Sequence, residues 1–397
     1  MNSSDGIWLT IMSWDTEVMR INLGLGVYDV LNETLLPYGL KGKIRLVPSF
    51  ESVKTKYDDT QRQIALNKNN QAITSWLACR VLLLSRTNAK WLYNAIKMEQ
   101  VETDIEKAKV SLMCRAVSIN DGYWVRIGNE DLSWSKVNTR TNPLNEIVAQ
   151  IALHGKSLTL QGSLMSPEFT THGAYAKAWR RHEDGSLWLY KKGDKDSSAS
   201  RIEVMVSNLL DKLTVEHCHY EAGEDDGHYV CMCPAMSTED IGILSGMDFV
   251  SYCNVNGINP DEEMMKIDSS SIYKMWIVDY LIANRDRHGQ NWGFYYDLDS
   301  MEILGCHPLF DHNNAFDKEW MNEPDSDYQF RNMTIRQAAH EAIKHETIRV
   351  KSPITRDDFI TDSQYKCFTE RARELGIDYS RAVSNSMSAT ISAMVTR

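Results

Sequence analysis

A short segment at residues 284–291, NRDRHGQN, combines acidic, basic and amide side chains directly after an apolar stretch. Its aspartate, Asp286, precedes Asn291 by five positions, and a second aspartate, Asp311, follows twenty positions after Asn291. In phosphoryl transfer, one carboxylate accepts the proton of the attacking hydroxyl, while an amide oxygen and a second carboxylate hold Mg²⁺. We therefore expect a phosphoryl-transfer site in which Asp286 is the base and Asn291 and Asp311 hold the metal.

The elements around this segment should bring the three side chains together. Apolar residues recur at helical spacing over residues 272–282, which predicts a buried helix that ends just before the charged segment. After Asn291, two strand-like runs flank the turn cluster at residues 297–300, which predicts a β-hairpin. Because a hairpin brings its two ends together, Asn291 and Asp311 should lie side by side.

Phosphoryl transfer also needs a lysine on a sheet that grips the phosphates and a glutamate that positions this lysine. A hairpin with its turn at residues 183–185 ends in Lys191 and Lys192, and a helical pattern follows over residues 200–213. Strand alternation favours Lys191 over Lys192 as the phosphate lysine. Glu203, near the start of the helix, is the expected partner of the lysine.

Several of these residues also have simpler interpretations. Asp286 could cap a helix or pair with a neighbouring arginine, and Glu203 could be a first-turn glutamate favoured by the helix dipole. His288, although part of the catalytic segment, is more easily explained as a hydrogen-bonding residue that fixes the loop, because kinase loops use the carboxylate as base. The combination of Asp286 with Asn291 and Asp311 favours catalysis for the aspartate.

Four motifs in a fixed order resemble those of the HipA-like serine/threonine kinases, a bacterial branch of the protein-kinase-like fold. They are TTHGAYAK at 170–177 as the phosphate loop, LYKK at 189–192 with Glu203, NRDRHGQN at 284–291 and PLFDHNNAF at 308–316. DGYWVR and SPEFTTHG also resemble parts of HipA-related proteins from anaerobic bacteria.

The resemblance implies an α+β, bilobal protein-kinase-like fold, with a small β-rich N-lobe and a helical C-lobe, preceded by a mixed α/β N-terminal domain. The expected divisions are an N-terminal accessory domain at 1–165, the kinase N-lobe at 166–236 and the kinase C-lobe at 237–397. Helical patterns near 335–346, 363–375 and 380–394 fit such a C-lobe.

The resemblance further implies transfer of the ATP γ-phosphate to serine or threonine of a protein substrate, with ATP and Mg²⁺ as cofactors. Many family members are the toxin of a toxin–antitoxin system, so the implied partner is a small antitoxin or DNA-binding protein. A small-molecule or lipid kinase, suggested by the run Asp286-Arg287-His288, is the first alternative. A nucleotide-binding pseudokinase scaffold is the second.

The family pattern also assigns residues to nucleotide binding and to autophosphorylation. Family members commonly carry an autophosphorylated serine just ahead of the phosphate loop, and the matching position here is a threonine. The nucleotide-binding candidates are Gly173, Lys177 and Lys191, with the adenine near Cys231 and Cys233. The autophosphorylation candidates are Thr170, Thr171 and Ser166.

Composition narrows the remaining function classes. The chain has 397 residues with 43% hydrophobic and 24% charged residues, as in globular proteins, and a formal net charge of −11, which argues against direct nucleic-acid binding by the whole surface. No apolar run approaches the length of a membrane span, and the N-terminus lacks signal-peptide features, so we expect a cytoplasmic protein without membrane contact.

The cysteines suggest neither disulfides nor a zinc finger. Eight cysteines with irregular spacing do not form a disulfide framework. Cys231 and Cys233, together with the run His217-Cys218-His219, fit no common zinc-finger spacing. We therefore expect no zinc site in this region.

Overall fold

The computed structural model describes residues 6–49, 52–98, 101–160, 162, 164–193, 196–328 and 332–382. The chain forms two compact units. The first unit comprises Met1–Asp194, Met232–Glu263 and Gly293–His307. The second unit comprises Lys195–Cys231, Met264–Trp292 and Pro308–Arg397.

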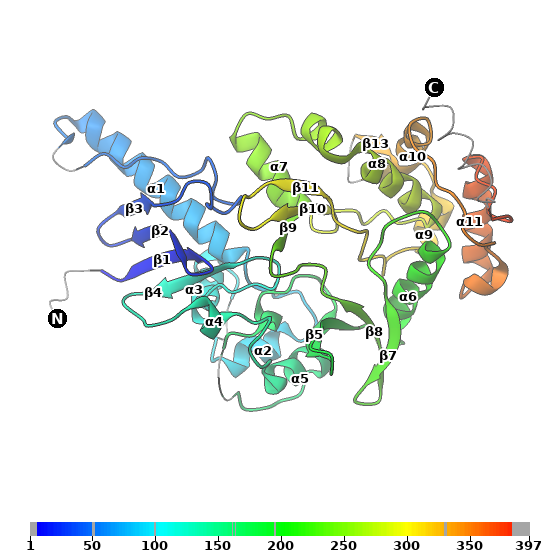
Figure 1. The fold of residues 1–397 in the computed structure, drawn as a ribbon, viewed down its shortest axis with the longest axis horizontal. Coiled ribbons are helices and arrows are strands. Elements are labelled where there is room, and N and C mark those ends of the chain that lie inside the picture. Colours follow the sequence, from blue (N-terminus) through cyan, green and yellow to red (C-terminus); the bar gives the residue numbers. More distant parts are fainter. Residues whose placement is uncertain are drawn as a thin grey trace, which may run out of the picture. The chain divides into compact units, whose positions relative to one another are not determined.

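The N-terminal part of the first unit is an antiparallel sheet with the strand order β3-β2-β1-β4. Helix α1 packs against this sheet, and Trp76 of α1 contacts Tyr123 of β4 edge to face at a ring distance of 6.4 Å (Figure 1). The elements of this part are β1 (Trp8–Ser13), β2 (Thr16–Asn22), β3 (Val27–Val30), α1 (Lys56–Ala78), α3 (Asp104–Met113) and β4 (Tyr123–Ile127).

A second core in the first unit supports the predicted phosphate loop. It is built from apolar residues of α2 (Ala89–Ala95) and α5 (Glu146–His154) together with Phe169 and Ala178, which flank the loop on either side. The 3₁₀ helix η2 (Pro167–Phe169) leads into the loop, and the antiparallel strands β5 (Ala176–Arg181) and β6 (Leu187–Lys192) follow it. The short helix α4 (Trp134–Val137) precedes α5. The hairpin predicted around residues 183–185 is confirmed.

The next strands along the chain are β7 (Glu221–Asp225), β8 (His228–Pro234), β9 (Ile241–Ser245), β10 (Gly293–Asp297) and β11 (Ile303–Cys306). One sheet has the order β5-β6-β8-β7, and the other has the antiparallel order β11-β10-β9. The division between the two units falls inside β8. Helix α7 (Gly246–Val255) packs on β10, where Phe249 and Phe294 have ring centroids 4.7 Å apart. The predicted hairpin after Asn291 is confirmed as β10 and β11.

The second unit is mainly helical (Figure 1). Its helices are α6 (Ser198–Asp211), most of α8 (Pro260–Leu281), α9 (Lys318–Asn322), α10 (Ile335–Ala342), η3 (Arg356–Asp358) and α11 (Asp362–Glu374), with the short strands β12 (Asp327–Tyr328) and β13 (Met333–Thr334). Helix α8 is kinked at Asp268, which has non-helical backbone angles. The predicted helices near 335–346 and 363–375 are thus present, while the one near 380–394 lies almost entirely outside the described residues.

The expected mixture of helices with antiparallel sheets is therefore confirmed. Among the helices within the described ranges, none combines the length and the apolar character that crossing a bilayer requires.

Candidate functional site

The segment 284–291 is held at the end of α8 by a fully buried ion pair. Arg287 donates from Nε and Nη2 to the two carboxylate oxygens of Asp279, at 3.0 and 2.8 Å, and neither side chain is exposed. Asn284 and Tyr328 also donate to this carboxylate. Burial by itself would lower the pKa of Arg287, but the contact with Asp279 outweighs it and raises this pKa above its usual value. The guanidinium is therefore a permanent cation at the centre of the loop.

The remaining nitrogen of Arg287 joins the two ends of the β10–β11 hairpin. Nη1 donates to the backbone carbonyl of Asn291 at 2.6 Å and to that of Phe310 at 3.1 Å. Asn291 precedes the hairpin and Phe310 follows it, directly before Asp311. The structure thus brings together the two segments that carry the predicted metal-binding residues.

Asp286 is linked to both of these segments. Its half-buried carboxylate accepts a hydrogen bond at 2.7 Å from the side-chain amide of Asn314, and its backbone carbonyl accepts one at 2.9 Å from the side-chain amide of Asn291. Asn314 belongs to the predicted motif at 308–316. Asp286, Asn291 and the stretch after Asp311 therefore form one hydrogen-bonded cluster within the second unit.

Asp311 has a backbone conformation that is uncommon for a residue with a side chain. Its φ angle is +61°, in the left-handed region that an aspartate tolerates better than most residues. The carboxylate accepts a hydrogen bond at 2.9 Å from the side-chain amide of Asn313. Glu203, fully buried in α6, accepts the backbone N–H of the next residue, His312, at 2.8 Å. The hydrogen bonds of Asp311 with Asn313 and of His312 with Glu203 thus fix the chain after Phe310.

Glu203 is the predicted partner of Lys191, which belongs to the other unit. The hydrogen bond from the backbone N–H of His312 places Glu203 beside the segment of Asp311. Its pairing with Lys191 stays a prediction.

His288 stabilises the catalytic segment from within. Its Nδ1 accepts the backbone N–H of Gln290 at 3.2 Å, and its carbonyl accepts the backbone N–H of Asn291 at 2.9 Å. An Nδ1 that accepts carries no proton in that state. These contacts fit the loop-fixing interpretation of His288.

In the first unit, two of the predicted phosphate-binding lysines lie directly opposite each other. Lys177 of β5 is paired in register with Lys191 of β6, and both residues are buried. Opposite residues of an antiparallel pair point to the same face, so the two ammonium groups share one side of the hairpin. Lys192, paired with Ala176, points to the other face and is half-buried.

The loop before β5 wraps closely around Lys177. The ammonium of Lys177 donates to the carbonyl of His172 at 2.8 Å. Gly173 has a φ angle of +107°, and a Cβ atom at this position would lie 2.1 Å from Nζ of Lys177. The single glycine of the motif therefore permits both the backbone turn and the approach of the lysine.

A buried arginine that sequence reasoning missed holds this loop. Arg86, with only 2% of its surface exposed, donates from Nη1 to the carbonyls of Glu168 at 3.0 Å and Thr171 at 3.1 Å, and from Nη2 to the carbonyl of Lys177. Burial lowers the pKa of Arg86 to about 10. Because arginine contacts backbone carbonyls here, no sequence motif marks the interaction. In the sequence, the only feature that could have drawn attention to Arg86 is its position between two apolar stretches.

Glu168 is the second buried ionisable group at the loop. Its carboxylate accepts the backbone N–H of Trp179 at 2.9 Å and the hydroxyl of Ser166, and burial raises its pKa.

Asp279 was also overlooked as the partner of Arg287. Its signal was an acidic residue in the otherwise apolar last turns of the predicted helix.

The three autophosphorylation candidates all contact protein groups. Besides Ser166, which bonds to Glu168, the hydroxyls of Thr170 and Thr171 donate to the carbonyl of Pro167, at 3.2 and 2.6 Å. Ser166 and Thr170 are buried, and Thr171 is half-buried.

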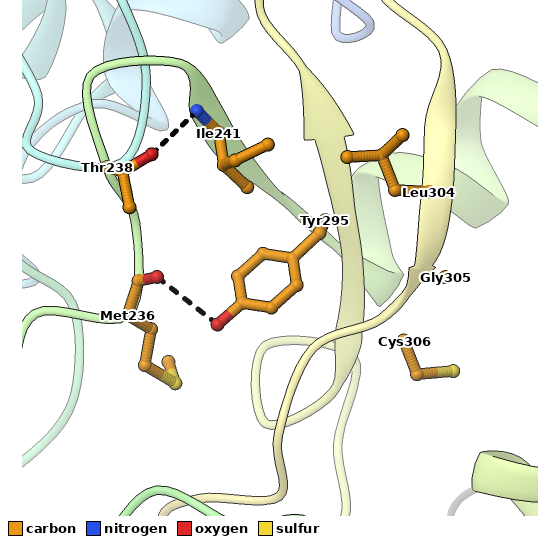
Figure 2. Close-up of a pocket in the computed structure, with 7 residues that line it drawn as sticks. All are labelled: Met236, Thr238, Ile241, Tyr295, Leu304, Gly305 and Cys306. Atoms are coloured by element: carbon orange, nitrogen blue, oxygen red, sulfur yellow. Dashed lines mark hydrogen bonds between the residues drawn. The ribbon is translucent and has the colours of Figure 1, made fainter.

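The adenine-binding candidates Cys231 and Cys233 are both buried in β8, on either side of the division between the units. A pocket of about 280 Å³ lies in the first unit and is lined in part by residues that follow β8 in the sequence. Figure 2 shows its lining, in which the hydroxyl of Tyr295 donates to the carbonyl of Met236 at 3.2 Å. The lining residues are Met236, Thr238, Ile241, Tyr295, Leu304, Gly305 and Cys306, so neither cysteine of β8 borders this pocket.

No family model and no curated protein matches the sequence. Among solved structures, the chain is similar to the proinflammatory kinase CtkA of Helicobacter pylori, with 14% identity and a TM-score of 0.32 over 50% of this chain and 89% of that one. It is also similar to HipA of the Shewanella oneidensis toxin–antitoxin system, solved with HipB and operator DNA, with 9% identity and a TM-score of 0.49 over 93% of this chain and 98% of that one.

Proposed function

We propose that the chain is an ATP- and Mg²⁺-dependent serine/threonine protein kinase of the HipA-like type. The observation that carries the proposal is the cluster in the second unit, where Arg287 joins the carbonyls of Asn291 and Phe310 and where Asp286 bonds to Asn291 and Asn314. A solvated loop at a helix end would not require a fully buried arginine–aspartate pair. This arrangement fixes a carboxylate beside an amide and a second acidic segment.

The residues present fit a magnesium ion. Asn291 and Asp311 offer amide and carboxylate oxygens, which are the hard ligands that Mg²⁺ prefers. The amide nitrogen of Asn291 donates to the carbonyl of Asp286, which identifies the other end of the amide as the oxygen. Asn291 and Asp311 are the residues that would hold the ion, which would neutralise charge on the phosphates of bound ATP.

The residues of the β5–β6 hairpin fit a polyphosphate. Lys177 and Lys191 are buried opposite each other, and their ammonium groups lie on the same face of the hairpin. Two ammonium groups on one face offer several hydrogen-bond donors to phosphate oxygens. We assign both lysines and the loop at Gly173 to phosphate binding, and residues Cys231 to Pro234 to the adenine.

In the proposed reaction, Asp286 accepts the proton of the serine or threonine hydroxyl and keeps the hydroxyl oriented for attack. Such a base contributes about 10²- to 10⁴-fold to the rate. Asn314 holds one carboxylate oxygen of Asp286, so the other can face the acceptor. Arg287 keeps the loop in shape without contacting the substrate.

The wider assignments follow from the same proposal. They comprise a bilobal kinase with an N-lobe at 166–236 and a C-lobe at 237–397, an accessory domain at 1–165 and a cytoplasmic location. They also comprise autophosphorylation near Thr170 and a small antitoxin as partner.

Transfer of labelled phosphate from ATP tests the function. The purified chain should label itself or a generic protein substrate in the presence of Mg²⁺, and Asp286→Asn should reduce labelling by about 10²- to 10⁴-fold. Asp311→Asn should abolish the labelling, and with it the dependence of labelling on Mg²⁺ concentration. Asp299→Asn, in the exposed turn of the β10–β11 hairpin, is the matched control. Undiminished labelling in both site variants would refute the mechanism.

Two further measurements separate the alternatives. Phosphoamino-acid analysis should find the label on serine or threonine. Label found by mass spectrometry only on a lipid or small molecule would replace the protein-kinase assignment. Binding of ATP in a thermal-shift assay without turnover would instead indicate a pseudokinase.

A further inference from the structure

Three potential metal ligands meet at the C-terminal end of α6, outside the proposed catalytic cluster. They are Asp211, the last residue of the helix, and His217 and His219 on the segment that follows. One ligand atom from each lies within 4.8 Å of the other two. Asp211 Oδ1 is 3.4 Å from Nε2 of His217, and Asp211 Oδ2 is 3.2 Å from Nδ1 of His219.

The backbone explains why both histidines face the aspartate. The segment pairs with Leu309, because the N–H of Cys218 donates to the carbonyl of Leu309 at 2.8 Å and the N–H of Leu309 donates to the carbonyl of Glu216 at 3.1 Å. In an extended segment, residues two positions apart point to the same side. His217 and His219 therefore share one side, and the buried Cys218 between them points to the other.

His217 presents a lone pair to this group. Its Nδ1 lies 3.1 Å from the carbonyl of Val215, and because a carbonyl only accepts, Nδ1 must carry the proton. In the neutral ring, Nε2 is then an acceptor. The side chain is only 7% exposed, and Nε2 finds no hydrogen-bond partner among the residues that the structure describes.

A buried imidazole lone pair that faces a carboxylate oxygen at 3.4 Å places two acceptors against each other. A cation between them would turn this repulsion into attraction. The Nδ1–H contact with a backbone carbonyl is the outer-shell bond by which proteins commonly orient a metal-ligating histidine. The C-terminal end of a 14-residue helix adds a negative potential at the same point.

We propose that Asp211, His217 and His219 form a binding site for a divalent transition-metal ion, with Zn²⁺ as the best fit. Two imidazole nitrogens and one carboxylate oxygen are ligands that suit zinc, and three protein ligands leave a coordination position for water or another molecule. The side chains of Asp211 and His219 are 48% and 49% exposed, so an ion can reach the site from solvent. No cysteine takes part, which is why zinc-finger spacings in the sequence did not reveal it.

The site lies outside the proposed catalytic cluster and is testable by metal binding alone. We would titrate Zn²⁺ into tag-free, chelator-treated full-length chain by calorimetry and record the absorption spectrum with Co²⁺. The variants are Asp211→Asn and His219→Gln, whose exposed side chains can be replaced without opening a core. His345→Gln is the matched control, because His345 is 48% exposed and pairs with a carboxylate, Glu341, at 3.1 Å but has no third ligand within the described residues.

The wild type and His345→Gln should bind the same number of ions, with one tight site that the other two variants lose. Loss of a ligand should weaken that site by more than the about 10- to 100-fold caused by removing an outer-shell partner. The Co²⁺ spectrum should show a low-symmetry site with nitrogen and oxygen ligands. Equal affinities in all four proteins, or a spectrum dominated by thiolate charge transfer that persists in both site variants, would overturn the proposal.

Discussion

Arg287 and Asp279 form an ion pair with two hydrogen bonds, and neither side chain is exposed to solvent. The pair ties the predicted catalytic segment to the end of α8, and the third nitrogen of the guanidinium reaches the backbone at both ends of a hairpin. The position of the proposed base therefore depends on an interaction that makes no contact with substrate.

Arg287→Met should strongly destabilise the second unit. Removing one partner leaves the carboxylate of Asp279 buried without its cation, which costs about 3–5 kcal/mol. Urea unfolding monitored by circular dichroism would measure the change. The control is Arg285→Met, two positions away, because Arg285 forms a partly exposed pair with Glu323 at 3.2 Å. That change should cost no more than about 1 kcal/mol, and equal losses in the two variants would contradict the structure.

Asn314→Ala should slow phosphate transfer while leaving the fold intact. The amide donates to the carboxylate of Asp286 at 2.7 Å, and a hydrogen bond to a charged group contributes about 1.5–3 kcal/mol. We expect kcat to fall about 10- to 100-fold, with a smaller change in KM for ATP. Asn322→Ala provides the comparison, because its amide donates to the carbonyl of Lys318 on an exposed helix end. A loss confined to KM would show that Asn314 acts in binding and does not position the base.

Gly173→Ala should weaken nucleotide binding. The new methyl group would meet Nζ of Lys177 at 2.1 Å, so the lysine would have to leave its position. Gly185→Ala separates this clash from backbone strain, because Gly185 also has a positive φ angle, +86°, but no atom of the described residues lies within 4 Å of its added Cβ. Both changes should cost about 1–3 kcal/mol of stability through strain. Only Gly173→Ala should raise the Kd for ATP, and equal Kd values would argue against Lys177 as a phosphate ligand.

Glu374 should make the second unit less stable at acid pH than at neutral pH. Hydrogen bonds from Arg336, His340 and Tyr280 outweigh the effect of partial burial and lower the pKa of Glu374 to about 2. A depressed pKa in the folded state adds stability above the ordinary carboxyl pKa of about 4.5, and this stability is lost as pH falls toward about 2.

Urea unfolding of wild type and Glu374→Gln at several pH values would test this. The difference in unfolding free energy should be largest near neutral pH and should shrink as the pH is lowered from about 4.5 toward 2. Glu370→Gln is the control, because Glu370 forms an exposed pair with Lys366 at 3.9 Å. A difference between wild type and Glu374→Gln that does not change with pH would exclude the proposed cause.

Local periodicity was sufficient to predict the elements around the candidate site. The alternation in residues 187–192 gave β6 and the orientation of Lys191, and the turn cluster at 297–300 gave the β10–β11 hairpin. Because a hairpin must return its chain, the proximity of Asn291 to the segment of Asp311 followed from the same pattern. The assignment of catalytic and nucleotide-binding roles to these residues stays a prediction.

Interactions between distant segments could not be predicted in this way. Arg86 holds a loop that begins more than eighty positions later, and it does so through backbone carbonyls that every residue has. Glu203 accepts the backbone N–H of His312, a contact that no spacing in the sequence indicates, while its pairing with Lys191 stays a prediction. The group Asp211, His217 and His219 depends on the end of a helix and on pairing with Leu309, neither of which appears in ligand spacing.

The pairing of His217 with Leu309 has a thermodynamic consequence. Leu309 lies two positions before Asp311, so an ion held by His217 would restrain the backbone that carries the proposed magnesium ligand. Linkage between two sites is reciprocal: if zinc alters the affinity for magnesium nucleotide by some factor, the nucleotide must alter the affinity for zinc by the same factor. Two binding isotherms, each measured with and without the other ligand, would therefore report one coupling energy from opposite directions.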